Sequence, residues 1–178
     1  VGNERLVSYN VEMTEVTGGT FWKAYTPAQI AGTEPFVLKG GFLGNATAST
    51  DLMQYYDPID LSDKKLRKLA KEIGPAWVRV SGTWSTKTYY DFDGHTNGVI
   101  PEGYNAILTR EQWLGVLDFC KDIGAKLLIS VADCEGLHHA DEPWNPSQAE
   151  QIFALSKEYG KAIDAAEFVN EPNLLAMS

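Results

Sequence analysis

Strand-like and helix-like segments alternate along the chain, and this alternation restricts the possible folds more than any other feature. The expected strands span Val7 to Met13, Ala76 to Trp84, Lys126 to Asp133 and Ala165 to Asn170. The expected helices span Leu61 to Ile73, Thr109 to Ile123 and Asn145 to Ile163. Strands separated by helices in this order predict an α/β protein whose parallel sheet is built from right-handed βαβ units.

The residue pattern inside each segment indicates its type. Apolar and polar residues alternate from Val7 to Met13, which is the period of a strand with two different faces. Between Lys126 and Asp133 the chain is apolar except for Ser130, as expected for a parallel strand covered on both faces. The first helix carries an apolar stripe and ends at a Gly-Pro pair; the stripe consists of Leu66, Leu69, Ala70 and Ile73.

The long irregular stretches all follow strands rather than helices. They run from Thr14 to Asp60, Ser85 to Leu108 and Cys134 to Trp144. Loops after the strands build the active face of a (β/α)8 barrel, whereas a doubly wound fold would show a glycine-rich turn after its first strand. We therefore predict that residues 1–178 form the N-terminal half of one (β/α)8 TIM barrel, strands one to four. A whole barrel needs about 250 residues, so strands five to eight are expected on a C-terminal segment or a second chain.

Composition excludes several classes of function. Fifteen Lys and Arg against 24 Asp and Glu give a net charge of -9, which would repel nucleic acid and anionic membranes. No apolar run approaches the roughly 20 residues that span a bilayer. The start of the chain leaves cytoplasmic and mature secreted proteins both open, and we favour a secreted or periplasmic location. Cys120 and Cys134 are too few for a disulfide framework and are expected to be buried thiols.

The fourth expected strand ends in Asn170-Glu171-Pro172, which places a carboxylate where barrel enzymes collect their catalytic groups. Cleaving a glycosidic bond requires an acid for the leaving oxygen and a second carboxylate at the oxocarbenium-like centre. Glu171 is our candidate for the acid. The alternative is that Glu171 is a solvated carboxylate that caps a following helix.

These residues resemble a known family. Asn170-Glu171-Pro172 after Glu167-Phe168-Val169 is similar to the acid/base motif of the large clan of retaining glycosidases with (β/α)8 barrels. The segment from Leu66 to Ala70, followed by the strand with Arg79 and Gly82-Thr83, resembles the heparanase-like β-glucuronidases. Ser8 to Glu12 fits the first strand of that family, although Glu12 replaces the shorter Asp expected there.

The resemblance implies a role for each matched residue. Glu171 would be the general acid/base, Asn170 a substrate ligand and Arg79 an orienter of the nucleophile. Glu12 and Thr83 would line the sugar pocket. Residue parity places Arg79, Ser81 and Thr83 on one strand face, opposite Val78 and Val80. A structural ion pair remains an alternative role for Arg79. The nucleophile of the family lies on strand seven, so this chain alone is expected to be inactive.

The loop from Asp133 to Glu142 contains His138 and His139 among several carboxylates. Adjacent histidines on a loop usually point apart, and the spacing of helical zinc motifs is missing, so we expect no metal and no cofactor. His138 is instead predicted to face the substrate groove, with a plain surface position as the alternative. Aromatic residues after the strands could stack on sugar rings or pack under the loops; they are Trp84, Trp144, Tyr89 and Tyr90.

The leading prediction is a retaining glycoside hydrolase that cleaves β-glucuronide-type linkages in an oligosaccharide or glycan. A C-terminal half with the nucleophile would complete it. Another clan member, such as a β-xylosidase or an endoglucanase, is the alternative within enzymes. A non-catalytic carbohydrate-binding half-barrel is the alternative from another class, and it predicts symmetric self-association through the sheet edges.

Overall fold

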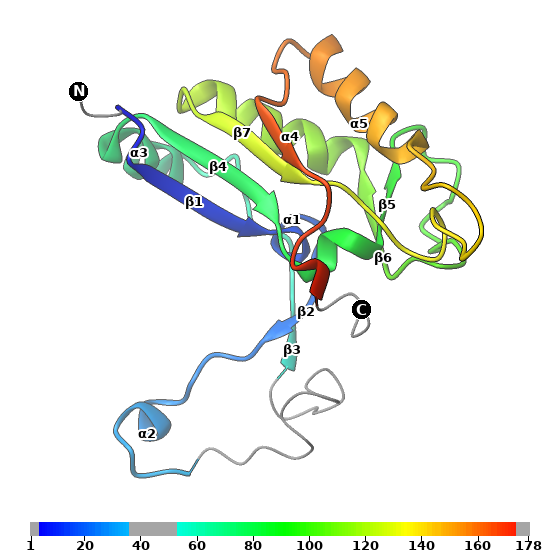
Figure 1. Ribbon diagram of the computed structural model, residues 1–178. Helices are drawn as coiled ribbons and strands as arrows, with labels where there is room; N and C mark the ends of the chain where they lie inside the picture. Colours follow the sequence, from blue (N-terminus) through cyan, green and yellow to red (C-terminus); the bar gives the residue numbers. More distant parts are fainter. Residues whose placement is uncertain (1–3, 36–52, 174–178) are drawn as a thin grey trace.

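The computed structural model describes residues 4–35 and 53–173, and its centre is a four-stranded parallel sheet (Figure 1). The strands are β1 (Val7–Glu12), β4 (Ala76–Ser81), β7 (Lys126–Ser130) and β8 (Ala165–Glu167). Their order in the sheet is β1-β4-β7-β8, which is also their order in the sequence. The alternating pattern of the chain thus gives the predicted α/β architecture with parallel strands.

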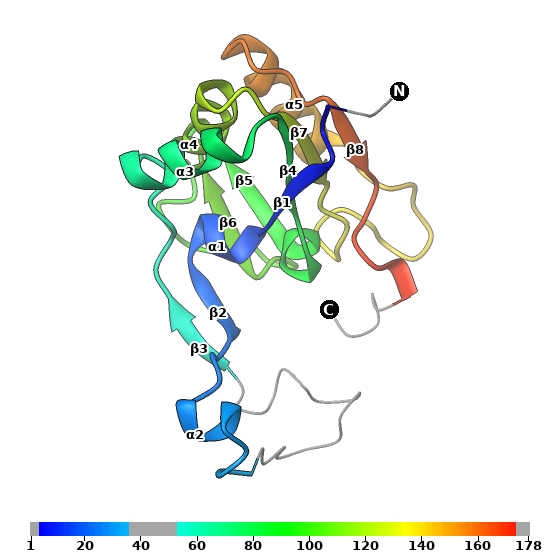
Figure 2. The same cartoon turned by 90° about the vertical axis from the view of Figure 1, so that its left-hand side faces the viewer.

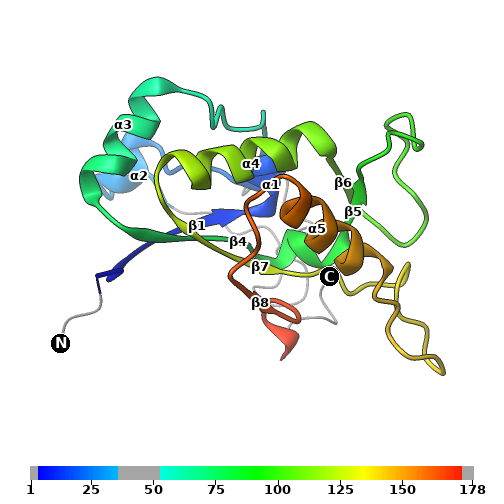
Figure 3. The ribbon, with the colours of Figure 1, turned by 90° about the horizontal axis from the view of Figure 1, so that it is seen from above.

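Helices link the strands and lie on the same side of the sheet (Figure 3). They are α3 (Lys64–Ile73), α4 (Arg110–Asp122) and α5 (Ser147–Glu158). Asp63 caps α3 through the Leu66 amide, and Thr109 with Gln112 forms a capping box at the start of α4. One sheet face is therefore covered by helices.

The covered face holds most of the hydrophobic core. Val78 and Val80 of β4 and Leu127 and Ile129 of β7 are at most 1% exposed. They pack with buried residues of α4 and α5, among them Trp113, Val116, Leu117 and Ile152. Because side chains alternate along a strand, the residues between these four point to the opposite face. That face is polar at Arg79, Ser81 and Ser130.

The stretch after β1 is not one irregular loop. It contains α1 (Met13–Thr17), β2 (Gly19–Trp22), α2 (Pro27–Ile30) and β3 (Met53–Tyr56). β2 and β3 form an antiparallel ribbon that extends away from the central sheet, as Figure 2 shows. Residues 36–52, which belong to the same predicted stretch, lie outside the described residues.

The stretch after β4 also contains regular structure. It holds the 3-10 helix η2 (Thr83–Lys87) and a pair of parallel strands, β5 (Thr88–Asp91) and β6 (Ala106–Thr109). The prediction of a loop from Ser85 to Leu108 was wrong for these residues. Short strands of four residues are too brief to show a clear hydrophobic period, so sequence alone did not distinguish them from a loop.

Several predicted boundaries also change. β4 ends at Ser81 rather than Trp84, and β8 ends at Glu167 rather than Asn170. The final helix is shorter than expected at both ends, since α5 covers only Ser147–Glu158. The stripe on α3 is only partly covered: Ala70 is buried, whereas Leu66, Leu69 and Ile73 are 38%, 50% and 54% exposed. No helix among the described residues is long and apolar enough to cross a membrane.

Candidate functional site

A polar cluster occupies the face of the sheet that the helices leave uncovered. Each strand contributes one or two side chains to the cluster: Asn10 of β1, Arg79 and Ser81 of β4, Ser130 of β7 and Glu167 of β8. The strand register explains the gathering, because Asn10 pairs with Arg79 and Ser130 pairs with Glu167. Parallel strands in register bring their carboxyl-terminal residues together at one end of the strands.

Arg79 connects the two outer strands of the sheet, β1 and β8. Its Nη1 donates to Asn10 Oδ1 at 2.6 Å, and its Nη2 donates to Glu167 Oε1 at 2.5 Å. The same Nη2 donates to Asn170 Oδ1 at 2.9 Å. The guanidinium thus binds β1, β8 and the residue before Glu171 at once. The ion pair with Glu167 agrees with the structural alternative for Arg79, and the contact with Asn170 brings that residue to the candidate site.

Glu167 is held in its charged form. Partial burial acts to raise the pKa of its carboxyl group, but hydrogen bonds from Ser130 and Ser81 and the charge of Arg79 outweigh burial and lower it. The Ser81 hydroxyl lies 2.8 Å from Glu167 Oε1, and Ser130 donates to the same oxygen. Glu167 therefore acts as an anion that fixes the position of Arg79.

Glu12 has the opposite electrostatic environment. Burial raises the pKa of its carboxyl group, the negative charges of Glu15 and Glu171 add to the effect, and Asn10 and Arg79 oppose it. Its Oε2 is buried, and no group of the described residues donates a hydrogen bond to it. Glu12 packs directly on Gly82, where a Cβ atom would lie 1.4 Å from Oε2. The Gly82 position, with φ of 94°, is thus reserved for glycine by both backbone and space.

Asn170 and Glu171 follow β8 at the carboxyl-terminal edge of the sheet. Asn170 Nδ2 donates to Glu171 Oε2 at 3.3 Å, while Asn170 Oδ1 accepts from Arg79. Glu171 is exposed and has φ of 47°, in the left-handed region that costs a residue with a Cβ roughly 1–2 kcal/mol. Strained backbone of this kind clusters at functional sites, where surrounding contacts hold it in place.

Thr83 does not lie where strand parity placed it. β4 ends two residues earlier, and Thr83 begins the 3-10 helix η2 after Gly82. The left-handed turn at Gly82 breaks the alternation, so Thr83 no longer shares a strand face with Arg79 and Ser81. Its predicted contact with a sugar is therefore not supported by strand geometry.

His138 lies apart from the Arg79 network. Its ring is 48% exposed, and Nδ1 lies 3.2 Å from Oδ1 of the buried Asp133. Its amide donates to the Cys134 carbonyl in a tight turn. These contacts fit the surface alternative as well as the groove prediction. Cys120 and Cys134 are buried and unpaired, as predicted.

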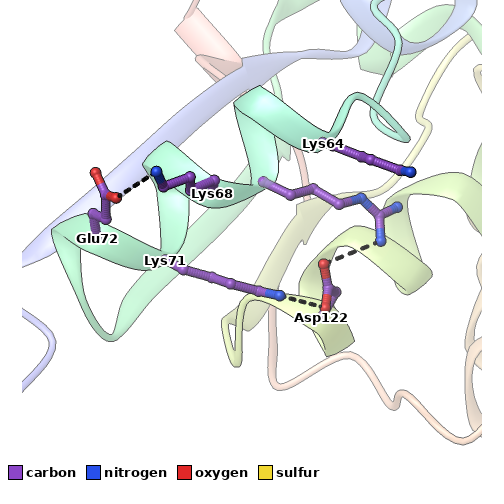
Figure 4. A pocket seen from close by; sticks show the side chains of 6 residues that line it. Lys64, Lys68, Lys71, Glu72 and Asp122 are labelled. Carbon is purple, nitrogen blue, oxygen red and sulfur yellow. Dashed lines mark hydrogen bonds and ion pairs between the residues drawn. The ribbon is translucent and has the colours of Figure 1, made fainter.

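A hollow in the surface of the helix layer is not part of this site. Figure 4 shows it along α3, lined by basic and acidic side chains of α3 and by Asp122 of α4. Lys71 and Arg67 already pair with Asp122, at 2.7 Å and 3.4 Å. It lies on the helices rather than at the carboxyl ends of the strands, and its cations are largely neutralised. The polar face is therefore the candidate functional site.

Sequence patterns alone missed three members of the cluster. Asn10 and Ser130 stood out only as polar positions within expected strands, and Glu167 only as part of a motif. Ser81 was placed on the correct strand face by parity. A signal was present, since Ser130 is the one polar residue inside an apolar strand. In the strand register, Ser130 pairs with Glu167, so its side chain lies beside that carboxylate.

A scan against protein-family models and a search among curated proteins each found no match for the chain. The likeness to heparanase-like glycosidases therefore stays an expectation carried by the motifs. The structure adds a guanidinium that binds the ionised Glu167. Glu12, which pairs with Ser81 in the strand register, is a second carboxylate, and its pKa is raised.

Proposed function

We propose that this chain is the N-terminal half of a (β/α)8-barrel retaining glycoside hydrolase that cleaves β-glucuronide-type linkages. Glu171 is its general acid/base, and Asn170 binds a sugar hydroxyl next to the scissile bond. Arg79 positions Asn170, and Glu12 lines the sugar pocket. A nucleophilic carboxylate on strand seven, from a further segment or a second chain, completes the reaction.

The fold supports the barrel part of the proposal. Strands in a doubly wound sheet reverse their order at a switch point and carry helices on both faces. Here the order β1-β4-β7-β8 never reverses, and α3, α4 and α5 lie on one side (Figure 3). This is the arrangement expected of consecutive βα units in a barrel wall, with the uncovered polar face directed inward.

The observation that carries the catalytic part is the contact between Arg79 Nη2 and Asn170 Oδ1 at 2.9 Å. It ties the residue before Glu171 to a cation that Glu167 holds in place. The strained Glu171 thus follows an anchored residue at the edge where barrel enzymes place their catalytic groups. A carboxylate that only caps a helix would need neither the anchor nor the strain.

The decisive experiment varies the leaving group. It uses the complete catalytic unit, meaning this chain with the segment or second chain that supplies strands five to eight. Glu171→Ala should lower hydrolysis of phenyl β-glucuronide by about 10²–10⁴-fold, because phenolate needs protonation. Hydrolysis of the dinitrophenyl glycoside should fall far less in its glycosylation step, because dinitrophenolate leaves without an acid.

Glu158→Gln is the matched control, since Glu158 is an exposed carboxylate on the outer helix α5. Its kcat and KM should equal those of the wild type on both substrates. Equal loss on the two substrates in Glu171→Ala would contradict the acid/base role, because a general disruption of the site does not depend on the leaving group.

A panel of aryl glycosides separates the enzyme alternatives. Faster cleavage of a β-xyloside or of cello-oligosaccharides than of β-glucuronides would replace the proposed specificity with that of a xylosidase or an endoglucanase. Sedimentation of the purified chain tests the remaining alternative. A symmetric oligomer that binds glycans and hydrolyses none of the panel would indicate a carbohydrate-binding half-barrel.

A further inference from the structure

Away from the polar face, the end of β5 gathers three side chains of metal-binding type. Asp91 is the last residue of β5, and Asp93 and His95 follow it at intervals of two residues. One ligand atom from each of the three lies within 4.8 Å of the other two. Neither the proposed glycosidase chemistry nor the sequence motifs use these residues.

Asp91 has a carboxylate oxygen without a donor. Its side chain is only 5% exposed, and Oδ2 accepts from the Thr96 hydroxyl at 2.5 Å. Oδ1 is buried and has no hydrogen-bond partner among the described residues, although it faces His95 Nδ1 at 3.3 Å. A buried anionic oxygen left in this state is destabilising, and a cation at the centre of the group would relieve it.

The imidazole of His95 points the same nitrogen at both carboxylates. Nδ1 lies 2.5 Å from Asp93 Oδ1 and 3.3 Å from Asp91 Oδ1. On the other side of the ring, Nε2 lies 3.3 Å from the Tyr89 hydroxyl. A proton on Nε2, shared with Tyr89, leaves the lone pair on Nδ1. Metal-bound histidines are commonly oriented in this way by a partner on the other nitrogen.

We propose that Asp91, Asp93 and His95 bind a divalent transition-metal ion of the zinc or manganese type. An imidazole with two carboxylates suits these ions better than Ca²⁺ or Mg²⁺, which prefer oxygen ligands alone. Three protein ligands leave coordination positions that water fills. The ion joins the end of β5 to the segment that leads to β6, and this role does not depend on the glycosidase proposal.

The competing description is a plain ion pair between His95 and Asp93. Both side chains are largely exposed, at 57% and 74%, so such a pair alone would contribute little stability. It also leaves the buried Asp91 Oδ1 without a hydrogen bond, although the same His95 nitrogen lies 3.3 Å away. The two descriptions differ in one measurable property, which is saturable binding of a metal ion.

The test is calorimetric titration of the whole chain with Zn²⁺ after removal of metals by a chelator. The wild type should bind one equivalent. His95→Gln and Asp93→Asn should each weaken that binding at least about 100-fold, because losses in the outer shell alone cost about 10- to 100-fold. His139→Gln is the control, since it removes an exposed histidine from another loop, and it should bind as the wild type does.

A second variant keeps the result interpretable if substitutions near Asp91 disturb folding. Tyr89→Phe retains the ring, which packs edge-on against Tyr104 at 5.0 Å, and removes only the hydroxyl. It should fold normally by circular dichroism and weaken zinc binding about tenfold. Absence of saturable binding to the wild type, or equal affinity in His95→Gln and the wild type, would overturn the proposal.

Discussion

The two faces of the parallel sheet differ completely in chemistry, although the same strands form both. Under the helices, Val78, Val80, Leu127 and Ile129 are buried against apolar neighbours. On the other face, Arg79 and Ser81 of β4 and Ser130 of β7 join a network with Glu167. Neighbours in the sequence therefore serve different purposes. The covered face contributes apolar burial, and the uncovered face carries charged and hydrogen-bonded groups.

The covered face should be far more sensitive to truncation than the rest of the molecule. Leu127→Ala removes a fully buried side chain and should lower the free energy of unfolding by about 2–5 kcal/mol. Leu66→Ala is the control, because Leu66 is 38% exposed and should lose about 1 kcal/mol or less. Urea denaturation measures both. Similar losses in the two variants would remove the distinction between the core and the helix surface.

The contribution of the polar face to stability can be measured at Glu167. Its pKa is lowered from the ordinary 4.5, so it stabilises the folded state above that pH, and the effect is lost as the pH falls through its folded pKa. Glu167→Gln should lower the free energy of unfolding by about 1 kcal/mol at pH 7. The loss is this small because the side chains of Arg79 and Glu167 are 31% and 36% exposed, and solvent screens their ion pair.

The same variant should also flatten the dependence of stability on pH below about 5. Glu158→Gln provides the baseline for these denaturation curves, since Glu158 is exposed on α5. A wild-type curve that coincides with that of Glu167→Gln at every pH would show that the network around Arg79 has no energetic importance.

Substitution of Glu12 should give the smallest change in stability, and at pH 7 this change should be opposite in sign to that of Glu167→Gln. The pKa of Glu12 is raised, so its contribution is favourable below 4.5 and is lost as the pH rises through its folded pKa. Glu12→Gln should therefore raise the free energy of unfolding by about 0.5 kcal/mol at pH 7. At pH 4 the same variant should leave the free energy of unfolding unchanged or lower it. Denaturation at the two pH values measures this, and destabilisation at pH 7 would contradict the sign.

Much of the fold followed from local patterns. The alternation of valine with polar residues in β4 indicated a strand with Val78 and Val80 on one face, and both are buried. The expected start of the second helix at Thr109 agrees with α4, whose N-cap is Thr109. Thr83 was misplaced because one glycine with positive φ ends the strand early, and the pattern of side chains carries no such signal.

The candidate site was only partly visible before the strands were aligned. The Asn170-Glu171-Pro172 motif marked the end of β8 as a candidate site, although the strand itself is shorter than predicted. The partners of Arg79 were not visible, because Asn10, Glu167 and Asn170 are 69, 88 and 91 residues away in the sequence. The Asp91 cluster is local in sequence, but only burial singles it out from ordinary exposed acids.

The sequence by itself determined the order of strands and helices, the apolar face of the sheet and the carboxylate after its last strand. These features depend on periods of two and 3.6 residues and on short-range capping, which neighbouring residues specify. Only the tertiary structure decided which polar groups meet, which carboxyl pKa rises and which falls. Such outcomes depend on strand register and on burial, and both arise from contacts between residues that are distant along the chain.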